Sequence, residues 1–532
     1  MDRRTLLAII LCFGIFLAWQ KLYIEPHMPK QAPTTAQTQP LSTDSTSATT
    51  GSGAQQSPVA QTQAAAPQTK KPAQTESLIS GTGDAILADS GKWIRSWNLK
   101  EYYRGLSVDT GAVDVQAVTN QPEQIELAFD DPSLAYLTGV QGDFKKTQDG
   151  VVWTYEDANV KMERRFTATT GQNFLGVDVN VQFKNQHPRY AFISLSGMKH
   201  KEKDPEERDR QLLYFTNDSI ERVALGSEIP LREVGTAVKF IGVQSRYFLF
   251  SLVNNSPIEA KALIQPTAAG AGRVNLVYPI TSNSVSIPLK AYFGPKALPI
   301  LRSVDPTLDH TVDFGWFTPI AYPLLSILRW FYQFVHNYGV AIILLTVLLK
   351  LITYPLTYKS MKSMKQMSRL QPELQKIRDR HADDKEAQNR AVLEFMRSNG
   401  YNPAAGCLPM LIQMPIFFAL YRVLYSSIEL YHAPFAIWIK DLSAHDPFYV
   451  TPVLMSVTMF MQQKLSPSTA TDPVQQKMMM MMPLIFGAFM LSLPSGLTLY
   501  MLVNALVSII QQLIMNKKLN IGHGPAVAAS SR

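Results

Sequence analysis

Cysteine is nearly absent from this chain of 532 residues, which contains only Cys12 and Cys407. Two cysteines that lie in or beside apolar runs build neither a disulfide framework nor a metal cluster. The sequence also shows no phosphate-binding glycine loop and no catalytic triad. We therefore expect no metal, no other cofactor and no enzyme activity.

Large apolar side chains are almost absent from residues 26–77, which are rich in Pro, Gln, Thr, Ser and Ala. Such a segment cannot bury enough apolar surface to offset the entropy that a chain loses on folding. We therefore expect a disordered tether between the N-terminal segment and the rest of the chain.

The N-terminal segment, residues 1–25, has two arginines near its start and then a run of apolar residues. A cleaved signal peptide is one interpretation, but no Ala-x-Ala-like cleavage site follows the run. Trp19, Lys21 and Tyr23 follow instead, and these residue types anchor helices at membrane–water interfaces. The pattern favours an uncleaved transmembrane anchor, with its basic start in the cytoplasm and the following chain exported.

Residues 78–315 alternate apolar and polar side chains over short segments that Gly, Asn, Asp and Pro interrupt, as in "VVWTYED", "FLGVDVNVQF" and "RVNLVYPI". This two-residue period predicts a large antiparallel β domain, long enough for a sandwich of two sheets. Its histidines are scattered through the sequence and suggest no site: His187, His200 and His310. We expect a binding or scaffolding domain in the periplasm.

Residues 338–515 are strongly apolar and predict five membrane-crossing helices. The last stretch is too long for one span, and "LPSG" at 493–496 breaks it into a hairpin of two helices. The predicted spans cover residues 338–358, 408–427 and 447–465 and the two halves of 478–515.

Residues 316–337, just before the first of these spans, contain Arg329, two prolines and an aromatic end. They could be a further span. The pattern fits better with an amphipathic helix that lies on the outer surface of the same membrane. The anchor and the five-helix core then make six spans, with both termini in the cytoplasm.

Basic residues gather in one loop of the apolar part. Residues 359–405 carry ten Lys and Arg, whereas residues 428–446 carry only Lys440. The positive-inside rule therefore places the first loop, and the tail of residues 516–532 with its two lysines, in the cytoplasm.

This cytoplasmic loop reads as a helical hairpin, residues 359–402. Leu370, Leu374 and Ile377 share one face of its first helix, and Leu393 and Met396 share one face of its second. Asp383 or Asp384 is the expected N-cap of the second helix.

Acidic residues are absent from all five predicted core spans, yet Lys350 lies inside the first. A charge at the centre of a membrane helix costs about 2.5–3.5 kcal/mol even on the most lenient scale. Lys350 lies about 13 Å along the helix from Lys359. We expect it to face a hydrated groove lined by protein, where it attracts acidic or polar segments. The alternative is that its long side chain reaches the cytosolic interface.

Five segments carry a resemblance to a known family: "YPLTYKSMKSMKQMSRLQPELQKIRDR", "NPAAGCLPMLIQMPIFFALY", "APFAIWIKDLSAHDPFYVTPVLM", "TDPVQQKMMMMMPLIF" and "LPSGLTLYMLVNALVSIIQQ". Through them, residues 340–515 resemble the YidC-type membrane protein insertases of Gram-negative bacteria. The resemblance implies a polytopic α-helical membrane protein with a periplasmic all-β super-sandwich domain. It also implies a hydrophilic groove that is open to the cytosol and to lipid and closed to the periplasm.

The resemblance also implies which residues line the substrate-binding groove. The family carries an arginine where this chain has Lys350, so the charge is kept but the bidentate fork of arginine is lost. Met501 stands where the family pattern has a second tyrosine, and Arg422 is another departure. The implied groove residues are Lys350, Thr346, Gln413, Met414, Phe417, Tyr500 and Met501.

The implied function is to insert inner-membrane proteins and to help them fold, with or without the Sec translocon. The implied partners are nascent inner-membrane proteins, the Sec translocon, membrane lipid, and ribosomes or targeting factors at the cytoplasmic hairpin. A solute transporter with Lys350 as an anion site is the main alternative, but residues 338–515 show no internal repeat. A carbohydrate-active enzyme in the β domain is the other, but no convincing acid/base pair supports it.

Overall fold

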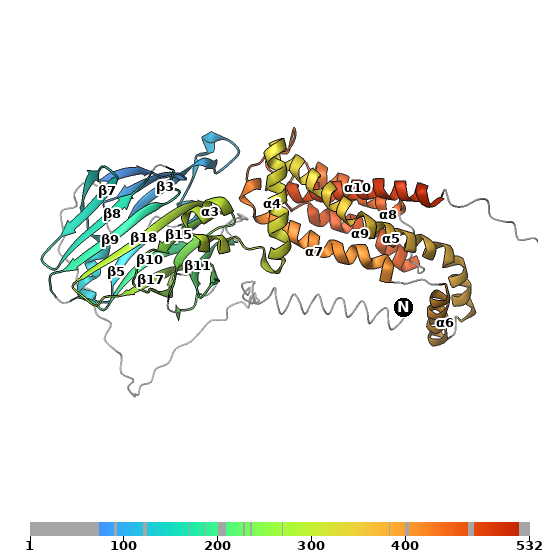
Figure 1. Ribbon diagram of the computed structural model, residues 1–532, viewed down its shortest axis with the longest axis horizontal. Coiled ribbons are helices and arrows are strands. Elements are labelled where there is room, and N and C mark those ends of the chain that lie inside the picture. Colours follow the sequence, from blue (N-terminus) through green and yellow to red (C-terminus); the bar gives the residue numbers. More distant parts are fainter. Residues whose placement is uncertain are drawn as a thin grey trace, which may run out of the picture.

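The structure is a computed structural model, which describes residues 74–89, 93–120, 125–169, 171–185, 187–199, 209–226, 229–234, 237–268, 270–381, 384–399, 404–465 and 473–520. The predicted anchor, nearly all of the tether, most of the tail, His200 and Asp383 lie outside these residues. The described residues form a β domain and a bundle of long helices that lie end to end (Figure 1).

Within the described residues, the largest sheet has nine antiparallel strands. Their order is β12 (Ser219–Ala224), β11 (Gln211–Thr216), β14 (Phe240–Gln244), β15 (Phe248–Asn254), β18 (Ser284–Pro295), β9 (Leu175–Phe183), β8 (Val160–Thr167), β7 (Gly150–Glu156) and β6 (Asp143–Thr147).

Two smaller sheets complete the β domain as far as the structure describes it. One has the order β13 (Arg232–Val234), β16 (Lys261–Ala268), β17 (Ala271–Pro279), β10 (Tyr190–Met198) and β5 (Ile125–Phe129). The other has the order β1 (Thr75–Ile79), β2 (Gly83–Ala88), β3 (Ile94–Tyr103) and β4 (Ala112–Asp114).

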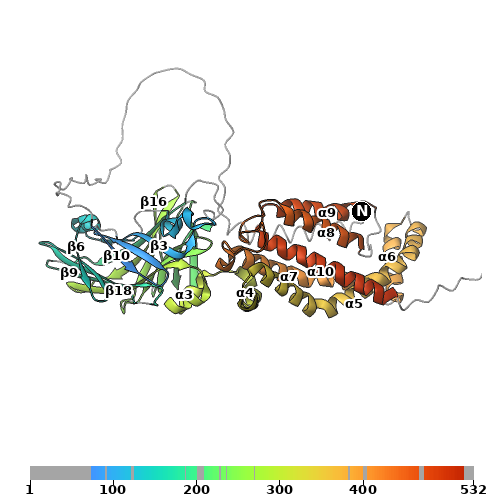
Figure 2. The same cartoon turned by 90° about the horizontal axis from the view of Figure 1, so that it is seen from above.

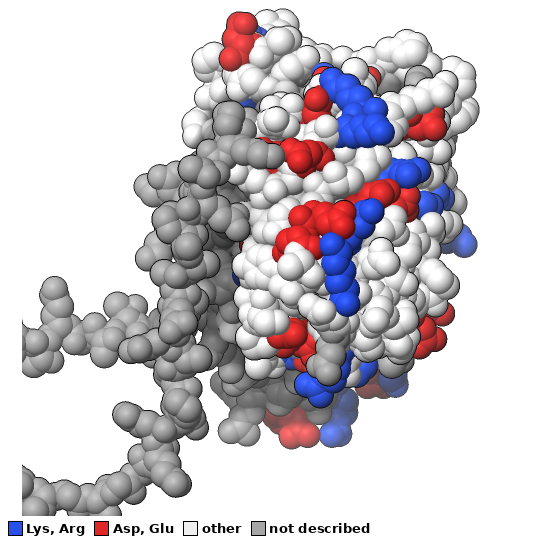
Figure 3. Space-filling view, turned by 90° about the vertical axis from the view of Figure 1, so that its left-hand side faces the viewer, with Lys and Arg blue, Asp and Glu red and all other residues white. Residues whose placement is uncertain are grey.

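Alternating side chains from the sheets meet in one apolar core, as the two-residue period predicts. In β9, for example, Leu175, Val177 and Val179 are buried while the residues between them are half-buried. Leu195 of β10 and Val243 of β14 belong to the same core, so the five-stranded sheet packs on the nine-stranded one. On the face of the domain shown in Figure 3, acidic and basic side chains are interspersed rather than gathered by sign.

Strand β1 starts at Thr75, before the predicted start of the β domain at residue 78. The sequence "TESLI" lacks a strong apolar pattern, but an edge strand needs only its backbone to pair with a neighbour. Here β1 pairs antiparallel with β2, from Thr75 opposite Ala88 to Ile79 opposite Asp84.

The long helices after the β domain are α4 (Thr318–Val335), α5 (Tyr338–Arg380), α6 (Lys385–Ser398), α7 (Ala404–Ser426), α8 (Val450–Leu465), α9 (Pro473–Met490) and α10 (Ser495–Asn520). By length and composition, two described stretches suffice to cross a membrane: Tyr338–Gln366 and Ser495–Lys517. That all five core helices do so stays a prediction.

Helix α5 does not end at residue 358, where the apolar run ends. It continues without a break to Arg380 and forms the first arm of the hairpin. The residues after 358 include many Lys, Met, Gln and Arg, which are strong helix formers. The helix therefore continues although its residues are no longer mainly apolar. The predicted break at "LPSG" lies between α9 and α10, although Ser495 and Gly496 already belong to α10.

The hairpin of α5 and α6 projects from the end of the bundle that is remote from the β domain (Figure 1). The carboxylate of Asp384 caps α6 by accepting hydrogen bonds from the backbone N–H groups of Ala387 and Glu386, which lower the pKa of Asp384. Leu374 packs against Val392, with the partly buried Leu370, Ile377, Phe395 and Met396 around them. Leu393, which the spacing puts on the same face of α6 as Met396, lies next to Val392 at the edge of this contact and has an exposed side chain.

Helix α4 runs across the end of the bundle that faces the β domain (Figure 1), and Figure 2 shows it end-on. Its buried face consists of Ala321, Leu324, Leu325 and Leu328, which join the core of the bundle. Arg329 forms an ion pair with Glu429 of the α7–α8 connection, with 2.7 Å between Nε and Oε1.

The β domain contacts the connection that follows α7. Tyr431 donates a hydrogen bond to the carbonyl of Tyr103 over 2.9 Å, and its ring packs edge-on against Phe248. Arg246 pairs with Asp209 at 3.0 Å and lies 3.8 Å from the ring centroid of Tyr425. These contacts join the β domain to the end of α7 and to the connection that follows it.

Candidate functional site

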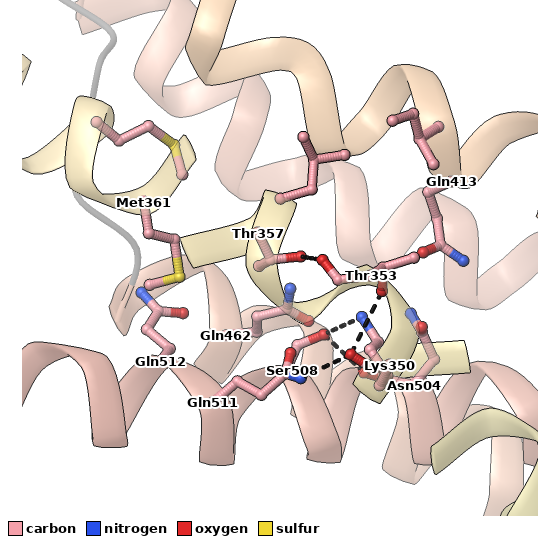
Figure 4. Close-up of a pocket in the computed structure, with 13 residues that line it drawn as sticks. Lys350, Thr353, Thr357, Met361, Gln413, Gln462, Asn504, Ser508, Gln511 and Gln512 are labelled. Carbon is pink, nitrogen blue, oxygen red and sulfur yellow. Dashed lines mark hydrogen bonds between the residues drawn. The ribbon is translucent and has the colours of Figure 1, made fainter. Parts of the chain in front are cut away.

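A pocket with many polar side chains lies between α5, α7, α8 and α10 (Figure 4). Hydroxyls, amides, methionines and one ammonium group line it, and none of these lining residues carries a carboxylate. They are Lys350, Thr353, Leu356, Thr357, Met361, Met364, Ile412, Gln413, Gln462, Asn504, Ser508, Gln511 and Gln512.

Lys350 provides the only charge among these lining residues, and α10 holds it in place. The Lys350 ammonium donates a hydrogen bond to Ser508 Oγ over 2.7 Å. The hydroxyl of Ser508 in turn donates a hydrogen bond to the backbone carbonyl of Asn504 at 2.7 Å, so its oxygen can accept from Lys350. Gln511 donates to the backbone carbonyl of Lys350 at 3.3 Å. These contacts join α5 to α10 on the floor of the pocket.

The two threonines of the pocket lie on the same face of α5 as Lys350. Thr353 donates to the carbonyl of Leu349 at 2.8 Å, and Thr357 donates to the carbonyl of Thr353 at 3.0 Å. Each hydroxyl thus satisfies its proton within its own helix and presents its oxygen to the pocket. The pocket therefore offers a cation, hydroxyl oxygens and amide groups to a polar guest.

Of the groove residues implied by the resemblance, Lys350 and Gln413 line this pocket. Gln413 also donates a hydrogen bond from Nε2 to the hydroxyl of Tyr500, at 2.8 Å. Tyr500 is buried behind it, outside the lining. The structure thus brings three of the predicted residues together: Lys350, Gln413 and Tyr500.

The other predicted residues lie elsewhere. Thr346 is buried and donates to the carbonyl of Ile342 at 2.7 Å, so it faces the core of the bundle. Phe417 and Met501 are partly buried against that core, and Met414 is 48% exposed on the surface of α7. None of these four is among the residues that line the pocket.

Arg422 of α7 is exposed, and nothing in the structure explains this departure from the family pattern.

The wall of the pocket on α10 was missed from the sequence. Asn504, Ser508, Gln511 and Gln512 are spaced by four, three and one residues, which puts them on one face of a helix. Polar residues with that spacing in an apolar run are a readable signal. Their meaning depended on knowing that this face of α10 meets Lys350, which only the packing of α5 against α10 shows.

Comparisons with known proteins agree with this arrangement of a β domain and a helical region. The family model of the 60Kd inner membrane protein matches residues 330–522, and the model of the YidC periplasmic domain matches residues 87–327. A solved structure described as an active YidC insertase is similar over 83% of this chain and 92% of that chain, at 18% identity and a TM-score of 0.36.

Two curated relatives are similar over almost their whole length. The membrane protein insertase YidC of Geobacter metallireducens is 35% identical over 98% of this chain and 99% of its own length. The membrane protein insertase YidC of Maridesulfovibrio salexigens is 32% identical over 97% of this chain and 98% of its own length. Because these matches span both domains, this chain belongs to the YidC family of inner-membrane proteins with a periplasmic domain.

Proposed function

We propose that this chain inserts proteins into the inner membrane and helps them to fold, and that the pocket around Lys350 receives the polar residues of the entering segment. The observation that carries the proposal is the ammonium group of Lys350, held by one hydroxyl in a pocket whose lining residues include no carboxylate. Such a site gives acidic and polar groups a partner at a depth where lipid offers none.

The direction of the pocket along α5 supports entry from the cytosol. Its lining on α5 runs from Lys350 to Met364, which is about 21 Å of helix. Most of the basic hairpin lies beyond Met364, and α4 crosses the opposite end of the bundle. We infer six spans, both termini in the cytoplasm, and a pocket that is accessible from the cytosolic side. The number of spans, the placement of the termini and the cytosolic access are thus parts of the proposed function.

The driving force in this scheme is the transfer of apolar client residues from water to lipid. Polar client residues cross beside the hydroxyls, amides and Lys350, so they remain hydrogen-bonded on the way. No nucleotide or metal is needed for such a step. The exposed methionines and leucines near the pocket, such as Leu411 and Met414 on α7, suit clients of varied apolar sequence.

Variants of Lys350 test the role of the charge. Two matched clients are needed, one with an acidic and one with a neutral exported loop. We expect Lys350→Arg to be nearly neutral, Lys350→Ala to lower insertion of the acidic client several-fold, and Lys350→Glu to be worst. Reversal of the sign acts in a partly desolvated site, where charge interactions are stronger than in water.

Insertion is measured as the protease-protected yield at equal expression. If Lys350 only reached towards the cytosolic interface, the Ala variant would be tolerated for both clients. If the chain were instead an anion transporter, all variants would insert both clients equally and only anion flux would change. Equal yields for the Lys, Ala and Glu forms would therefore contradict the proposal.

The hairpin of α5 and α6 is the proposed contact for ribosomes or targeting factors, and the Sec translocon is a proposed partner of the helices. The hairpin has its own small core around Leu374 and Val392, and it carries an excess of basic residues that suits ribosomal RNA. Removal of residues 370–398 should slow the insertion of ribosome-delivered clients. Normal insertion of every client after this deletion would exclude the hairpin as a receptor.

A further inference from the structure

The turn of residues 435–440, in the connection between α7 and α8, exposes an apolar side chain that the described residues leave almost uncovered. Ile437 is 91% exposed, more than any other large apolar side chain in the described residues. Its φ angle is +24°, in a region that β-branched residues rarely adopt. Asn or Gly would suit a water-exposed turn of this shape better.

The turn is well fixed in spite of this residue. The backbone of Phe435 donates to Ile439 at 2.9 Å, and that of Ile439 donates to Ala436 at 2.7 Å. Ile439 is buried, and Trp438 packs against the core of the bundle. The neighbours of Ile437 therefore hold it outward, and its exposure does not come from a loose loop.

Contacts with the first residues of α5 also hold the turn in place. Asn337 accepts a hydrogen bond from the backbone of Val340 and caps α5, while its Nδ2 donates to the carbonyl of Phe435 at 3.0 Å. The ring of Phe435 lies so close to Gly339 that a Cβ there would meet its Cδ2 at 2.0 Å. The apolar run of α5 starts at this point, so the turn lies at the outer end of the first core helix.

Helix α4 brings further exposed apolar side chains to this end of the bundle. Trp330 is 53% and Phe334 is 65% exposed, and their ring centroids are 4.9 Å apart. Phe334 precedes Asn337 by three residues, so the end of α4 and the turn meet at the start of α5. Lys440 is exposed on the turn itself and can reach lipid phosphate groups.

We propose that the turn of residues 435–440 inserts Ile437 into the boundary between head groups and acyl chains of the outer leaflet, beside Trp330 and Phe334. The occupant is phospholipid. Aromatic, aliphatic and lysine side chains together suit this boundary, because it accepts apolar bodies and charged ends at one depth. The turn and the end of α4 would then set the height of the helical bundle in the membrane. The inference rests on the proposed placement of α5 across the bilayer.

A depth measurement tests it on the full chain. In a background with Cys12→Ser and Cys407→Ser, an environment-sensitive dye is attached through Ile437→Cys, and through Ala436→Cys as a second position in the turn. The variants are reconstituted in vesicles of phosphatidylethanolamine and phosphatidylglycerol. Quenching by nitroxides at shallow or deep positions of the lipid is compared with quenching by aqueous iodide. Leu351→Cys serves as a mid-helix control, and Ile79→Cys as an exposed control on the β domain; both native residues are 64% exposed.

We expect the dye at residue 437 to be quenched several-fold more by shallow than by deep nitroxides and to be shielded from iodide. The dye at residue 351 should respond to the deep nitroxide, and that at residue 79 to iodide alone. If residues 436 and 437 both behave like residue 79 while residue 351 responds to lipid, the anchor is wrong and the proposed function stands. If residue 351 also responds to iodide alone, the membrane placement fails and the anchor with it. Shielding of residue 437 that needs an added client or translocon would assign the turn to a protein partner and overturn the lipid proposal.

Discussion

The β domain and the helical bundle each carry a cationic side chain that lies on a strand or helix beside apolar residues. The surroundings of the two cations differ. Arg164 of β8 is buried in the sandwich, with its guanidinium carbon 4.0 Å from the ring centroid of Trp153 and 5.0 Å from that of Trp93. Lys350 of α5 is half-buried beside a pocket of hydroxyls and amides.

The surroundings of the two cations distinguish the structural role of Arg164 from the binding role that we propose for Lys350. Aromatic faces attract the guanidinium of Arg164 from within the closed core, and burial lowers its pKa to about 9. Nothing can approach it without unfolding the sandwich. Lys350 is held by Ser508 at 2.7 Å and still faces a space that a guest can enter. A buried charge therefore indicates a site only where the packing leaves room beside it.

The largest expected effect comes from truncating the closed cation. Arg164→Ala leaves a cavity between two tryptophans and should destabilise the β domain by about 3 kcal/mol or more, as for other large buried side chains. Insertion should change little, because the pocket lies in the helices. Chemical unfolding followed by tryptophan fluorescence measures the first effect, and protease-protected client yield the second. Arg165→Ala is the matched control, since that side chain is 53% exposed on the same strand. A severe loss of insertion at normal expression would break the comparison.

A smaller and selective effect is expected at the residue that holds the open cation. Ser508→Ala removes a hydrogen bond to a charged group, which is worth about 1.5–3 kcal/mol in proteins. Insertion of the acidic client should fall several-fold and that of the neutral client much less, whereas Ser508→Thr should restore it. Ser456→Ala is the control, because that hydroxyl bonds only to the carbonyl of Pro452 in its own helix among the contacts described. An equal loss for both clients would show that Ser508 serves the packing of the helices alone.

The last effect is confined to alkaline pH and concerns a third cation, Lys296, which directly follows β18. Burial, and then the charge of Arg222, lower the pKa of Lys296 to about 7, although Asp209 and Asp313 act against this. An unfolded lysine titrates near pH 10.4. Between about pH 7 and 10 the unfolded chain therefore binds more protons, and the free energy of unfolding should rise with pH. Thermal midpoints of the full chain in detergent, measured across this range, should rise modestly, and Lys296→Met should flatten the slope. An identical slope in both proteins would assign it to other groups.

The strands and the helices were predictable wherever one physical signal dominated. Alternation in segments such as 175–183 predicts a strand because one face of a sheet must be buried, and β9 occupies these residues. The signal fails where pairing or helix propensity replaces hydrophobicity. The polar strand β1 is held by its neighbour β2, and the charged half of α5 is held by its own backbone hydrogen bonds.

The candidate site was predictable in part, and for a similar reason. Lys350 stands out in the sequence because a lone charge in an apolar run has a high cost, and Gln413 followed from the family resemblance. The spacing puts Leu393 and Met396 on one face of α6, but only the position of α5 decides that Val392 is buried and Leu393 exposed. No rule of spacing assigns Ser508 to Lys350 across 158 residues of chain.

The sequence by itself determined the division into a β domain and apolar helices, the family, and the residue that carries the charge. These properties depend on composition and on periods of a few residues, which are local in the chain. The tertiary structure decided that Ser508 and Gln511 hold Lys350, that Thr346 faces the core, and that Ile437 points outward at the start of α5. Such pairings depend on how helices far apart in sequence are rotated and placed against one another, and the packing of their side chains sets that geometry.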